Sequence, residues 1–333
     1  MARVGLRIGI LGATGALGGE VLAVLSESGL PVAEIVPMAK DDSIGRDVEL
    51  NGEVYAVESG LTRLRGLDFV ILCAPAAASL DAVREALRAS VPCIDASGVL
   101  AASPDVALQV AAFGARWSPD APLLVTPPGP ALALALVLRP LALAAGLVRV
   151  TATLLEGASN RGRAGIDALY QESLALFNQQ DLPDPGVFER PVAFDCIPVL
   201  GELDENGGSD HENALVRSLA RLLGDDLKLG VTAVQVPTFS GLGASVALET
   251  ARPLDPKEAA QVLAAAPGVE TWTENPRDAT MRAAAGRASA VVARLRRDPT
   301  SEHSLALWIA ADPLRLCATN AVGLAATRFG GAH

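Results

Sequence analysis

Short apolar runs alternate with helical patterns over about the first 125 residues of the chain. Leu6–Leu11 is such a run, typical of a strand that is buried on both faces of a parallel sheet. A turn with three glycines follows it, and then a helical pattern over Glu20–Leu25. Further strands are expected at Ala33–Met38, Asp68–Ala74 and Val91–Asp95, with a helix near Ser79–Ala89. This alternation predicts an α/β domain with a doubly wound parallel sheet.

The strongly apolar stretch Leu124–Leu141 marks the passage to the second half of the chain. It predicts the end of a strand, a Pro-Pro-Gly-Pro turn and then a buried helix. Proline is tolerated early in a helix because its missing N–H would have no partner there. The turn therefore presents a helix N-terminus, which would favour a nucleophile or an anion. Gly129, at the tip of this turn, has no side chain that could react.

Strands with fewer intervening helices are expected in the second half. This pattern predicts an α+β second domain with a mixed or antiparallel sheet. We therefore expect two domains, 1–128 with the C-terminal helix 313–330, and 129–312. The expected strands are Val148–Leu155, Val231–Pro237, Ala244–Glu249, Ala288–Leu295 and Leu305–Ala310; the expected helices are Ile166–Phe177, Glu212–Leu223 and Pro313–Arg328; and Asp181–Gly208 is expected to be irregular.

Composition excludes several classes of function. Half of the 333 residues are hydrophobic and 20% are charged, which excludes intrinsic disorder. The net charge of −11 argues against nucleic acid and anionic membranes as partners. The three histidines and four cysteines have no metal-ligand spacing, so no metal site is expected and the thiols should be reduced. Arg139-Pro140 interrupts the apolar window 130–148, which favours a core helix over a membrane span and a cytoplasmic protein.

The glycine turn, GATGALG at Gly12–Gly18, carries the first candidate chemistry. Strand, glycine turn and helix in this order form a dinucleotide fingerprint, in which a pyrophosphate binds free N–H groups at the helix N-terminus. The spacing G-x-x-G-x-x-G is not the commonest one, and a tight turn that needs small residues for packing is the alternative. The candidate cofactor-binding residues are Gly12, Ala13, Thr14, Gly15, Ala16 and Leu17, with Ala74 and Ser97 at the carboxyl ends of later strands.

The segment after the second strand bears on the choice between NAD and NADP. An acidic residue there accepts a hydrogen bond from a ribose hydroxyl and repels a ribose phosphate. Asp41 and Asp42 therefore favour NAD over NADP, and Ser43 belongs to the same candidate site. Lys40 weakens the preference, and a solvated charged turn is the alternative. Cys73 lies near the same sheet edge; we favour a buried small hydrophobe over an alternative nucleophile.

The order of these landmarks resembles the aspartate-semialdehyde dehydrogenase family over essentially the whole chain. The resemblance implies a dinucleotide-binding domain at 1–128 with 313–330, a catalytic-like and dimerisation domain at 129–312, and a homodimer. The last helix would return to the first domain. The matching stretches are GATGALGGEVL, PCIDAS, TPPGPALALALVLRPL, GASNRGRAGIDAL, AFDCIP, VQVPTFSGLG and LRLCATNAVGLA.

Active members of this family reduce an acyl phosphate with NADPH. A cysteine thiolate attacks the carbonyl and a histidine relays the proton. The resemblance places the cysteine position at Gly129 and the histidine position at Leu242. Neither residue can form the covalent bond or carry the proton, so no catalytic residue is expected at either position.

The positions around the substrate differ as well. The family's catalytic-domain glutamine lines up with Glu156, a residual polar candidate whose added charge would oppose an anionic acyl phosphate. The pattern resembles the divergent usg-type branch of the family, in which the scaffold is kept without the reaction. The remaining differences are Gln235 at the carboxylate-binding arginine, Ala101 at the phosphate-binding arginine, Ala214 at a lysine, and Gly323 at a glutamine that approaches the nicotinamide.

Three hypotheses about function follow from these differences. We favour a dinucleotide-binding, non-catalytic homodimer, a pseudoenzyme with a sensing, regulatory or scaffold role. The second is an NAD(P)-dependent oxidoreductase that acts on a different aldehyde or oxo substrate and uses Glu156 or Cys73. The third is an interaction protein that binds no nucleotide and keeps GATGALG only for packing.

Overall fold

The computed structural model describes residues 5–39, 43–60 and 64–330. These residues divide into two units. Unit 1 covers the described parts of Met1–Gly129 and of Cys317–His333, and unit 2 is Pro130–Leu316. Two helices, α3 (Gly129–Ala145) and α8 (Pro313–Phe329), contain the division points. Asp41 and Asp42, which we predicted to favour NAD over NADP, lie outside the described residues.

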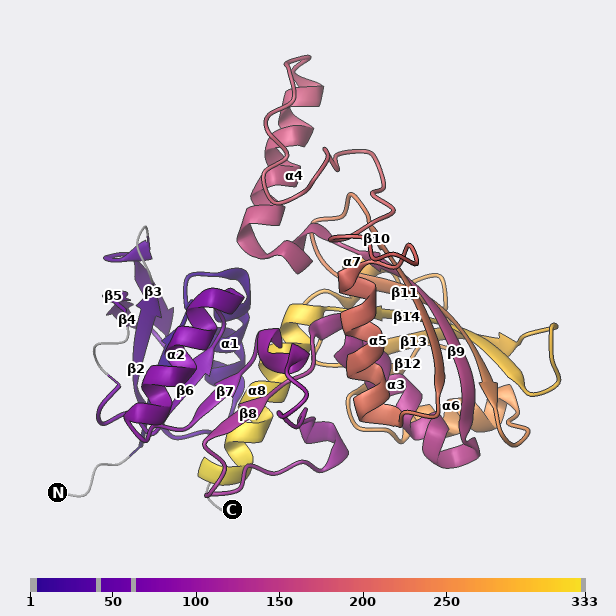
Figure 1. Cartoon of the computed structure of the whole chain (residues 1–333), viewed down its shortest axis with the longest axis horizontal. Coiled ribbons are helices and arrows are strands. Elements are labelled where there is room, and N and C mark those ends of the chain that lie inside the picture. The colour runs from indigo at the N-terminus through magenta and orange to yellow at the C-terminus, as the bar shows by residue number, and fades with distance from the viewer. Residues whose placement is uncertain (1–4, 40–42, 61–63, 331–333) are drawn as a thin grey trace. The chain divides into compact units, whose positions relative to one another are not determined.

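The sheet of unit 1 has six parallel strands in the order β5-β2-β1-β6-β7-β8 (Figure 1). The predicted apolar run forms its central strand β1, in which Ile8 and Ile10 have no exposed surface. The strands are β1 (Leu6–Leu11), β2 (Val32–Ala39), β5 (Glu58–Ser59), β6 (Phe69–Leu72), β7 (Cys93–Asp95) and β8 (Leu123–Val125), and the helices between them are α1 (Ala16–Glu27) and α2 (Ala76–Arg88).

Two crossover connections leave the centre of this sheet in opposite directions. Helix α1 connects β1 to β2, and α2 connects β6 to β7. Because such crossovers are right-handed, α1 and α2 cover opposite faces of the sheet. The strand order reverses between β1 and β6, the point where doubly wound sheets bind ligands at the carboxyl ends of their strands. The predicted doubly wound parallel sheet is confirmed.

Smaller elements complete unit 1. Strands β3 (Asp47–Leu50) and β4 (Glu53–Ala56) form a hairpin, and two short 3₁₀ helices, η2 (Val99–Ala102) and η3 (Ala111–Phe113), follow β7. The end of α8 packs on this unit through Phe329, whose ring stacks on Phe69 with a centroid distance of 4.8 Å. Trp117 meets the same ring edge-on at 5.5 Å. These aromatic contacts attach the C-terminal helix to unit 1.

The sheet of unit 2 has six strands in the order β10-β9-β11-β14-β13-β12. β9 pairs parallel with β10 and antiparallel with β11, so the predicted mixed sheet is confirmed. Its strands are β9 (Leu147–Glu156), β10 (Lys228–Gln235), β11 (Leu242–Thr250), β12 (Val269–Thr271), β13 (Ala290–Arg297) and β14 (Ser304–Ala311), and its further helices include α5 (Asp210–Leu223), α6 (Pro256–Ala264) and α7 (Met281–Ala284).

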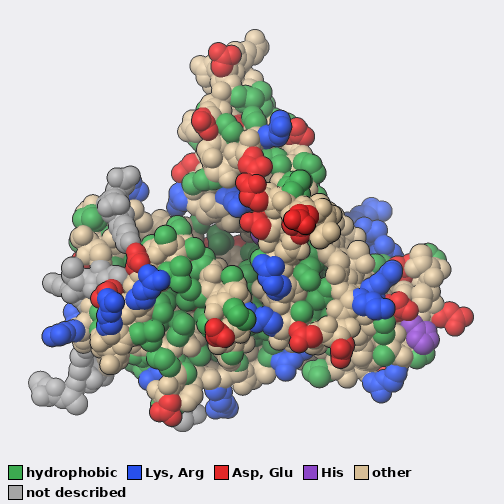
Figure 2. Space-filling view, viewed as in Figure 1, with side chains coloured by type: hydrophobic (Ala, Val, Ile, Leu, Met, Phe, Trp, Pro, Cys, Tyr) green, Lys and Arg blue, Asp and Glu red, His purple; other side chains and the backbone are tan. Residues whose placement is uncertain are grey.

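An arm projects from the sheet of unit 2. It consists of the 3₁₀ helix η4 (Ala158–Arg161), helix α4 (Gly162–Phe177) and the returning segment 178–208, which runs beside α4 (Figure 1). The returning segment contains no helix or strand, as predicted. A small apolar core and the buried Glu172 attach it to α4, because one Glu172 oxygen accepts the backbone N–H groups of Val192 and Ala193 at 2.7 and 2.9 Å. Hydrophobic side chains also gather on the outside of the arm (Figure 2).

Most of the apolar window 130–148 lies in α3. Among the described residues, no helix combines the length and the apolar character that a membrane crossing requires.

Candidate functional site

The predicted dinucleotide residues form the turn between β1 and α1. Gly12 adopts φ +81°, and a Cβ there would lie 2.9 Å from the carbonyl oxygen of Cys73. A Cβ on Gly18 would lie 2.2 Å from the carbonyl oxygen of Gly12, so the helix can approach the turn only because Gly18 has no side chain. The N-cap residue Gly15 provides no side-chain cap. The first N–H groups of α1 are therefore left for a ligand, as in anion sites at helix N-termini.

The turn also meets the segment that follows β2. The Thr14 hydroxyl donates to the Ser43 hydroxyl at 3.0 Å, which brings two of the candidate residues together. The turn lies at the carboxyl end of β1, where the strand order reverses. Ala74 and Ser97 follow the neighbouring strands β6 and β7. A pyrophosphate on the amides of α1, with its ribose toward Ser43, fits these residues.

Asp95, at the end of β7, organises the loop that contains Ser97. One Asp95 oxygen accepts the Ser97 hydroxyl at 2.5 Å and the N–H groups of Ser97 and Gly98 at 2.9 and 3.1 Å. The other oxygen accepts the N–H of Leu100 at 2.8 Å. Burial raises the pKa of Asp95, and these hydrogen bonds oppose that rise. The sequence interpretation named Ser97 but not the carboxylate that holds it.

The raised pKa of Asp95 predicts a pH effect on stability. When the pKa of an acid is higher in the folded than in the unfolded protein, the acid contributes to the free energy of unfolding at low pH. This contribution is fully present below the unfolded pKa, about 3.9 for aspartate, and is lost as the pH rises through the folded pKa. Asparagine does not titrate. The wild-type free energy of unfolding should therefore fall relative to Asp95→Asn as the pH is raised from about 4 towards neutral. Urea unfolding across this range checks the prediction, with the exposed Asp120→Asn as control; a constant difference between wild type and Asp95→Asn would contradict it.

Cys73 is not an activated nucleophile. Burial raises the pKa of its thiol, and the charges of Asp95 and Cys317 raise it further. Cys317 on α8 is buried as well and lies 3.8 Å from the carbonyl oxygen of Pro127. The attacking species in cysteine chemistry is the thiolate, which this environment disfavours. The favoured interpretation of Cys73 as a small apolar residue agrees with this environment.

Gly129, which the resemblance places at the family's cysteine position, is the first residue of α3 and belongs to unit 1. The preceding turn packs closely on the loop after β7, because a Cβ on Gly98 would lie 2.8 Å from the backbone nitrogen of Pro128. Ala101, at the family's phosphate-binding position, is buried in the same loop. Neither Gly129 nor Ala101 brings a reactive or charged group to this part of unit 1.

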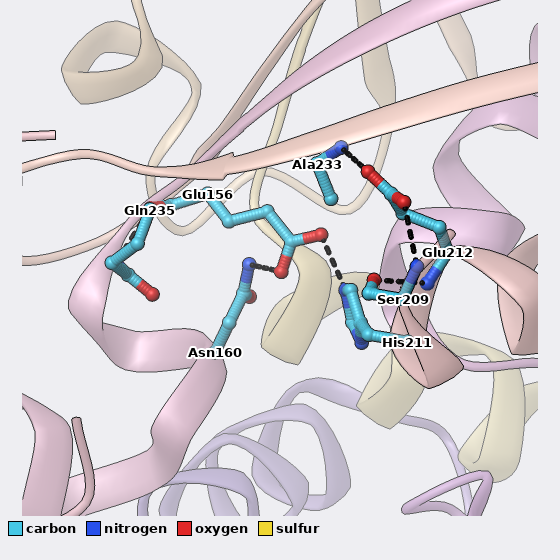
Figure 3. A network of polar contacts seen from close by, with 7 residues as sticks. All are labelled: Glu156, Asn160, Ser209, His211, Glu212, Ala233 and Gln235. Atoms are coloured by element: carbon cyan, nitrogen blue, oxygen red, sulfur yellow. Dashed lines mark hydrogen bonds and ion pairs between the residues drawn. The ribbon is translucent and has the colours of Figure 1, made fainter. Parts of the chain in front are cut away.

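Glu156, at the carboxyl end of β9, is the centre of a polar network in unit 2 (Figure 3). It is 1% exposed. Its Oε1 lies 2.8 Å from Nε2 of His211, and its Oε2 accepts the side-chain amide of Asn160 at 3.0 Å. Its backbone carbonyl accepts the side-chain amide of Gln235 at 2.7 Å. These partners make burial of a carboxylate tolerable, since both of its oxygens are hydrogen-bonded.

The sheet register brings three of the family's polar positions into one row. Glu156 pairs with Gln235 on β10 and with Leu242 on β11. Both neighbours are fully buried. Leu242, which the resemblance places at the family's histidine position, is thus an apolar residue directly beside Glu156 in the sheet. Gly129 belongs to unit 1, whereas Glu156 and Leu242 belong to unit 2.

His211 is the residue of this network that the sequence interpretation missed. It lies in the first turn of α5, which begins with a capping box between Ser209 and Glu212. Glu212 also accepts the backbone N–H of Ala233 on β10 at 2.9 Å, which fixes the start of α5 against the sheet edge. The Ser-x-x-Glu pattern could have predicted the helix start. Nothing local connects His211 with Glu156, which lies 55 residues earlier in the sequence.

A carboxylate that holds an imidazole is an arrangement that proteins use for proton transfer. The carboxylate fixes the orientation of the ring. Within the described part of the chain, no cluster of three or more His, Cys, Asp or Glu residues could hold a metal ion. The network thus offers a proton acceptor without a metal and without a nucleophile of its own.

A doubly wound domain with a glycine turn at its switch point, joined to a mixed-sheet unit, is an architecture typical of dehydrogenases that use a nicotinamide dinucleotide. Comparison with known families makes this specific. Residues 7–126 match the semialdehyde dehydrogenase NAD binding domain, and residues 138–316 match the semialdehyde dehydrogenase dimerisation domain. The chain belongs to the aspartate-semialdehyde dehydrogenase family.

Similar proteins extend over nearly the whole chain. The aspartate-semialdehyde dehydrogenase of Streptomyces akiyoshiensis is 32% identical over 336 residues, covering 96% of this chain and 97% of the relative. That of Rickettsia bellii is 30% identical, with 96% of each chain covered. The crystal structure of aspartate semialdehyde dehydrogenase II from Vibrio cholerae, complexed with ASA, has a TM-score of 0.91 at 26% identity and covers 99% of this chain and 100% of that one.

Proposed function

We propose that the chain is a nicotinamide dinucleotide-binding homodimer that does not oxidise aspartate semialdehyde in a phosphate-dependent reaction. It would be a usg-type pseudoenzyme of its family. The observation that carries the proposal is Leu242, a fully buried leucine at the family's histidine position, together with Gly129 at its cysteine position. A route through a thiohemiacetal needs both a thiolate and a proton relay.

The charge of the unit 2 network supports the same conclusion. Gln235 and Ala214 replace an arginine and a lysine of the family, and Glu156 replaces a neutral glutamine. The site has thus lost positive charge and gained a carboxylate. An anionic acyl phosphate is disfavoured by this exchange, since like charges repel most strongly where water is excluded.

The arm supports the proposed homodimer. Unit 2 matches a dimerisation domain, and the arm exposes three aromatic side chains, Tyr170, Phe177 and Phe194. The Phe177 and Phe194 rings contact each other at a centroid distance of 5.6 Å. An exposed apolar patch of this kind is typical of an interaction surface. In this proposal, 129–312 dimerises while 1–128 with 313–330 binds the dinucleotide.

The Glu156–His211 pair favours a second candidate, an NAD(P)-dependent oxidoreductase that acts on a different oxo or hydroxy substrate. When bound, a nicotinamide would supply the hydride donor or acceptor. Interconversion of a hydroxyl and a carbonyl group needs a proton acceptor but no thiol. His211 would accept the proton, and Glu156 would hold the imidazole ring in position.

Calorimetric titration of the full chain with NAD⁺ and with NADP⁺ tests the cofactor. We expect both to bind, with NAD⁺ about tenfold tighter, about 1.4 kcal/mol, because Asp41 and Asp42 repel a ribose phosphate. Asp41→Asn should remove most of this preference. Asp47→Asn, which makes the same charge change on β3, should leave it unchanged. Tighter binding of NADP⁺ would contradict the preference, and binding of neither would contradict the dinucleotide assignment itself.

A further inference from the structure

We propose that His211 and Glu156 form a ligand site in unit 2 for a molecule that presents a hydroxyl or amino hydrogen-bond donor and carries no negative charge. The inference rests on the proposed function in one respect, namely that the site has lost the family's anionic substrate. It is otherwise carried by the contacts of His211, Glu156 and Gln235. Figure 3 shows the Glu156 side chain extending between the other two residues.

The contacts of Glu156 determine which ring nitrogen of His211 carries the proton. An ionised carboxylate accepts hydrogen bonds and donates none. With an ionised Glu156, Nε2 of His211, 2.8 Å from Glu156 Oε1, is the donor. In a neutral imidazole the other nitrogen, Nδ1, then has a free lone pair and is an acceptor. Glu156 is in this way a positioning residue that presents Nδ1 as the acceptor.

Nδ1 is also the part of the pair that a ligand can reach. The side chain of His211 is 28% exposed, whereas that of Glu156 is 2% exposed. Within the described ranges, Nδ1 has no hydrogen-bond partner. Both oxygens of Glu156 are already used by His211 and Asn160. A ligand therefore meets the imidazole and not the carboxylate.

Gln235 adds a second acceptor to the same network. Its side-chain nitrogen donates to the backbone carbonyl of Glu156 at 2.7 Å, which leaves Oε1 as the free end of the amide. Gln235 is fully buried, and among the described residues its Oε1 has no partner. A buried acceptor without a partner is unfavourable until a donor reaches it. The network around Glu156 thus contains two acceptors without a donor, Nδ1 of His211 and Oε1 of Gln235.

The excess of acceptors fixes the chemical class of the ligand. A hydroxyl or amino group can donate to Nδ1, and the charge of Glu156 attracts a cation. A carboxylate or phosphate would meet an acceptor and a negative charge. No arginine or lysine among the described residues forms an ion pair with Glu156 that could reverse this preference.

Nitrogen NMR of the full chain with ¹⁵N-labelled histidine tests the site directly. The chain has only three histidines, so His303→Gln and His333→Gln assign the signals by removing one each. We expect His211 to be protonated at Nε2 and not at Nδ1. Three probes with the same three-carbon skeleton are then added, namely propane-1,3-diol, 1,3-diaminopropane and malonate. The diol and the diamine should shift Nδ1 of His211 and leave His303 unchanged, with malonate binding at least about tenfold more weakly.

Two substitutions of Glu156 separate positioning from folding. Glu156→Leu should lose the fixed tautomer of His211. The charge of Glu156 should make the wild type bind the diamine more tightly than the diol. Glu156→Gln should keep a hydrogen bond to Nε2 but lose this preference. Unfolding curves of both variants show whether the fold is retained. Protonation of His211 at Nδ1 in the wild type, equal response to malonate, or no response to any probe would overturn the proposal. Turnover of aspartate semialdehyde with the expected tautomer would instead overturn the proposed function and the exclusion of negatively charged ligands, but would leave Nδ1 of His211 as an acceptor.

Discussion

The purified chain, supplied with L-aspartate semialdehyde, phosphate and NAD⁺ or NADP⁺, is expected to show no turnover above a protein-free control. The family reaction needs a thiolate that attacks the carbonyl and a group that relays the proton. The resemblance places Gly129 and Leu242 at these positions, and neither residue has a titratable group. Losing a general base alone costs on the order of 10²–10⁴-fold, and losing the nucleophile removes the covalent route. We therefore expect a rate at least about 10⁴-fold below that of an active relative measured in parallel.

Single restorations are expected to fail as well. Gly129→Cys supplies a thiol but leaves Leu242 in place of the proton relay, and Leu242→His supplies an imidazole without a nucleophile. Gln235 and Ala214 would still leave the anionic substrate without its cationic partners. Because Leu242 is fully buried beside Glu156, its histidine variant needs a check of folding by circular dichroism. Wild-type turnover that scales with protein concentration and persists through further purification would contradict the prediction.

Most of the fold could be predicted because its strands are buried on both faces. Leu6–Leu11 reads as one apolar run for that reason, and β1 occupies the same residues. Strands with an exposed face carry a weaker signal. The hairpin of β3 and β4 was missed because both strands are short and mostly exposed. Its turn did contain a usable signal, Asn51-Gly52, since both residues adopt positive φ, 54° and 83°, as a type I′ turn requires.

Helix α6 was missed in the same way. It is short and only partly buried, so its apolar periodicity is weak. Its start carried a recognisable signal, since Asp255 accepts the N–H of Lys257 and Pro256 is the first helical residue. Local capping chemistry would have predicted where this helix begins, although not how it packs.

Within the candidate site, residues that are contiguous in sequence could be predicted, and residues that only the fold brings together could not. The glycine turn and its helix are contiguous in sequence, so the dinucleotide residues could be predicted from one segment. The Glu156–His211 pair depends on where α5 begins relative to the end of β9, which the capping box and Ala233 decide. The family resemblance identified Glu156 as a charged residue but did not predict its contact with His211. Only the sheet register places Gln235 and Leu242 on either side of it.

Two neighbouring glycines of α1 offer a matched test of the dinucleotide turn. We expect Gly18→Ala to weaken binding of NAD⁺ by at least tenfold, about 1.4 kcal/mol. The new Cβ would lie 2.2 Å from the carbonyl oxygen of Gly12 and 2.7 Å from Cα of Ala13, both of them backbone atoms. The turn must therefore shift, which should also destabilise unit 1 by about 1–3 kcal/mol. Calorimetry measures the binding, and thermal unfolding measures the stability.

Gly19→Ala is the control, because a Cβ at that position meets nothing within 4 Å. Alanine is the better helix former, so this variant should gain about 0.5–1 kcal/mol and bind NAD⁺ as the wild type does. A Gly18→Ala variant that is destabilised but binds normally would contradict contact between the turn and the pyrophosphate. If the wild type binds no dinucleotide and Gly18→Ala loses only stability, the glycines serve packing alone, and the interaction-protein hypothesis replaces the dinucleotide-binding one.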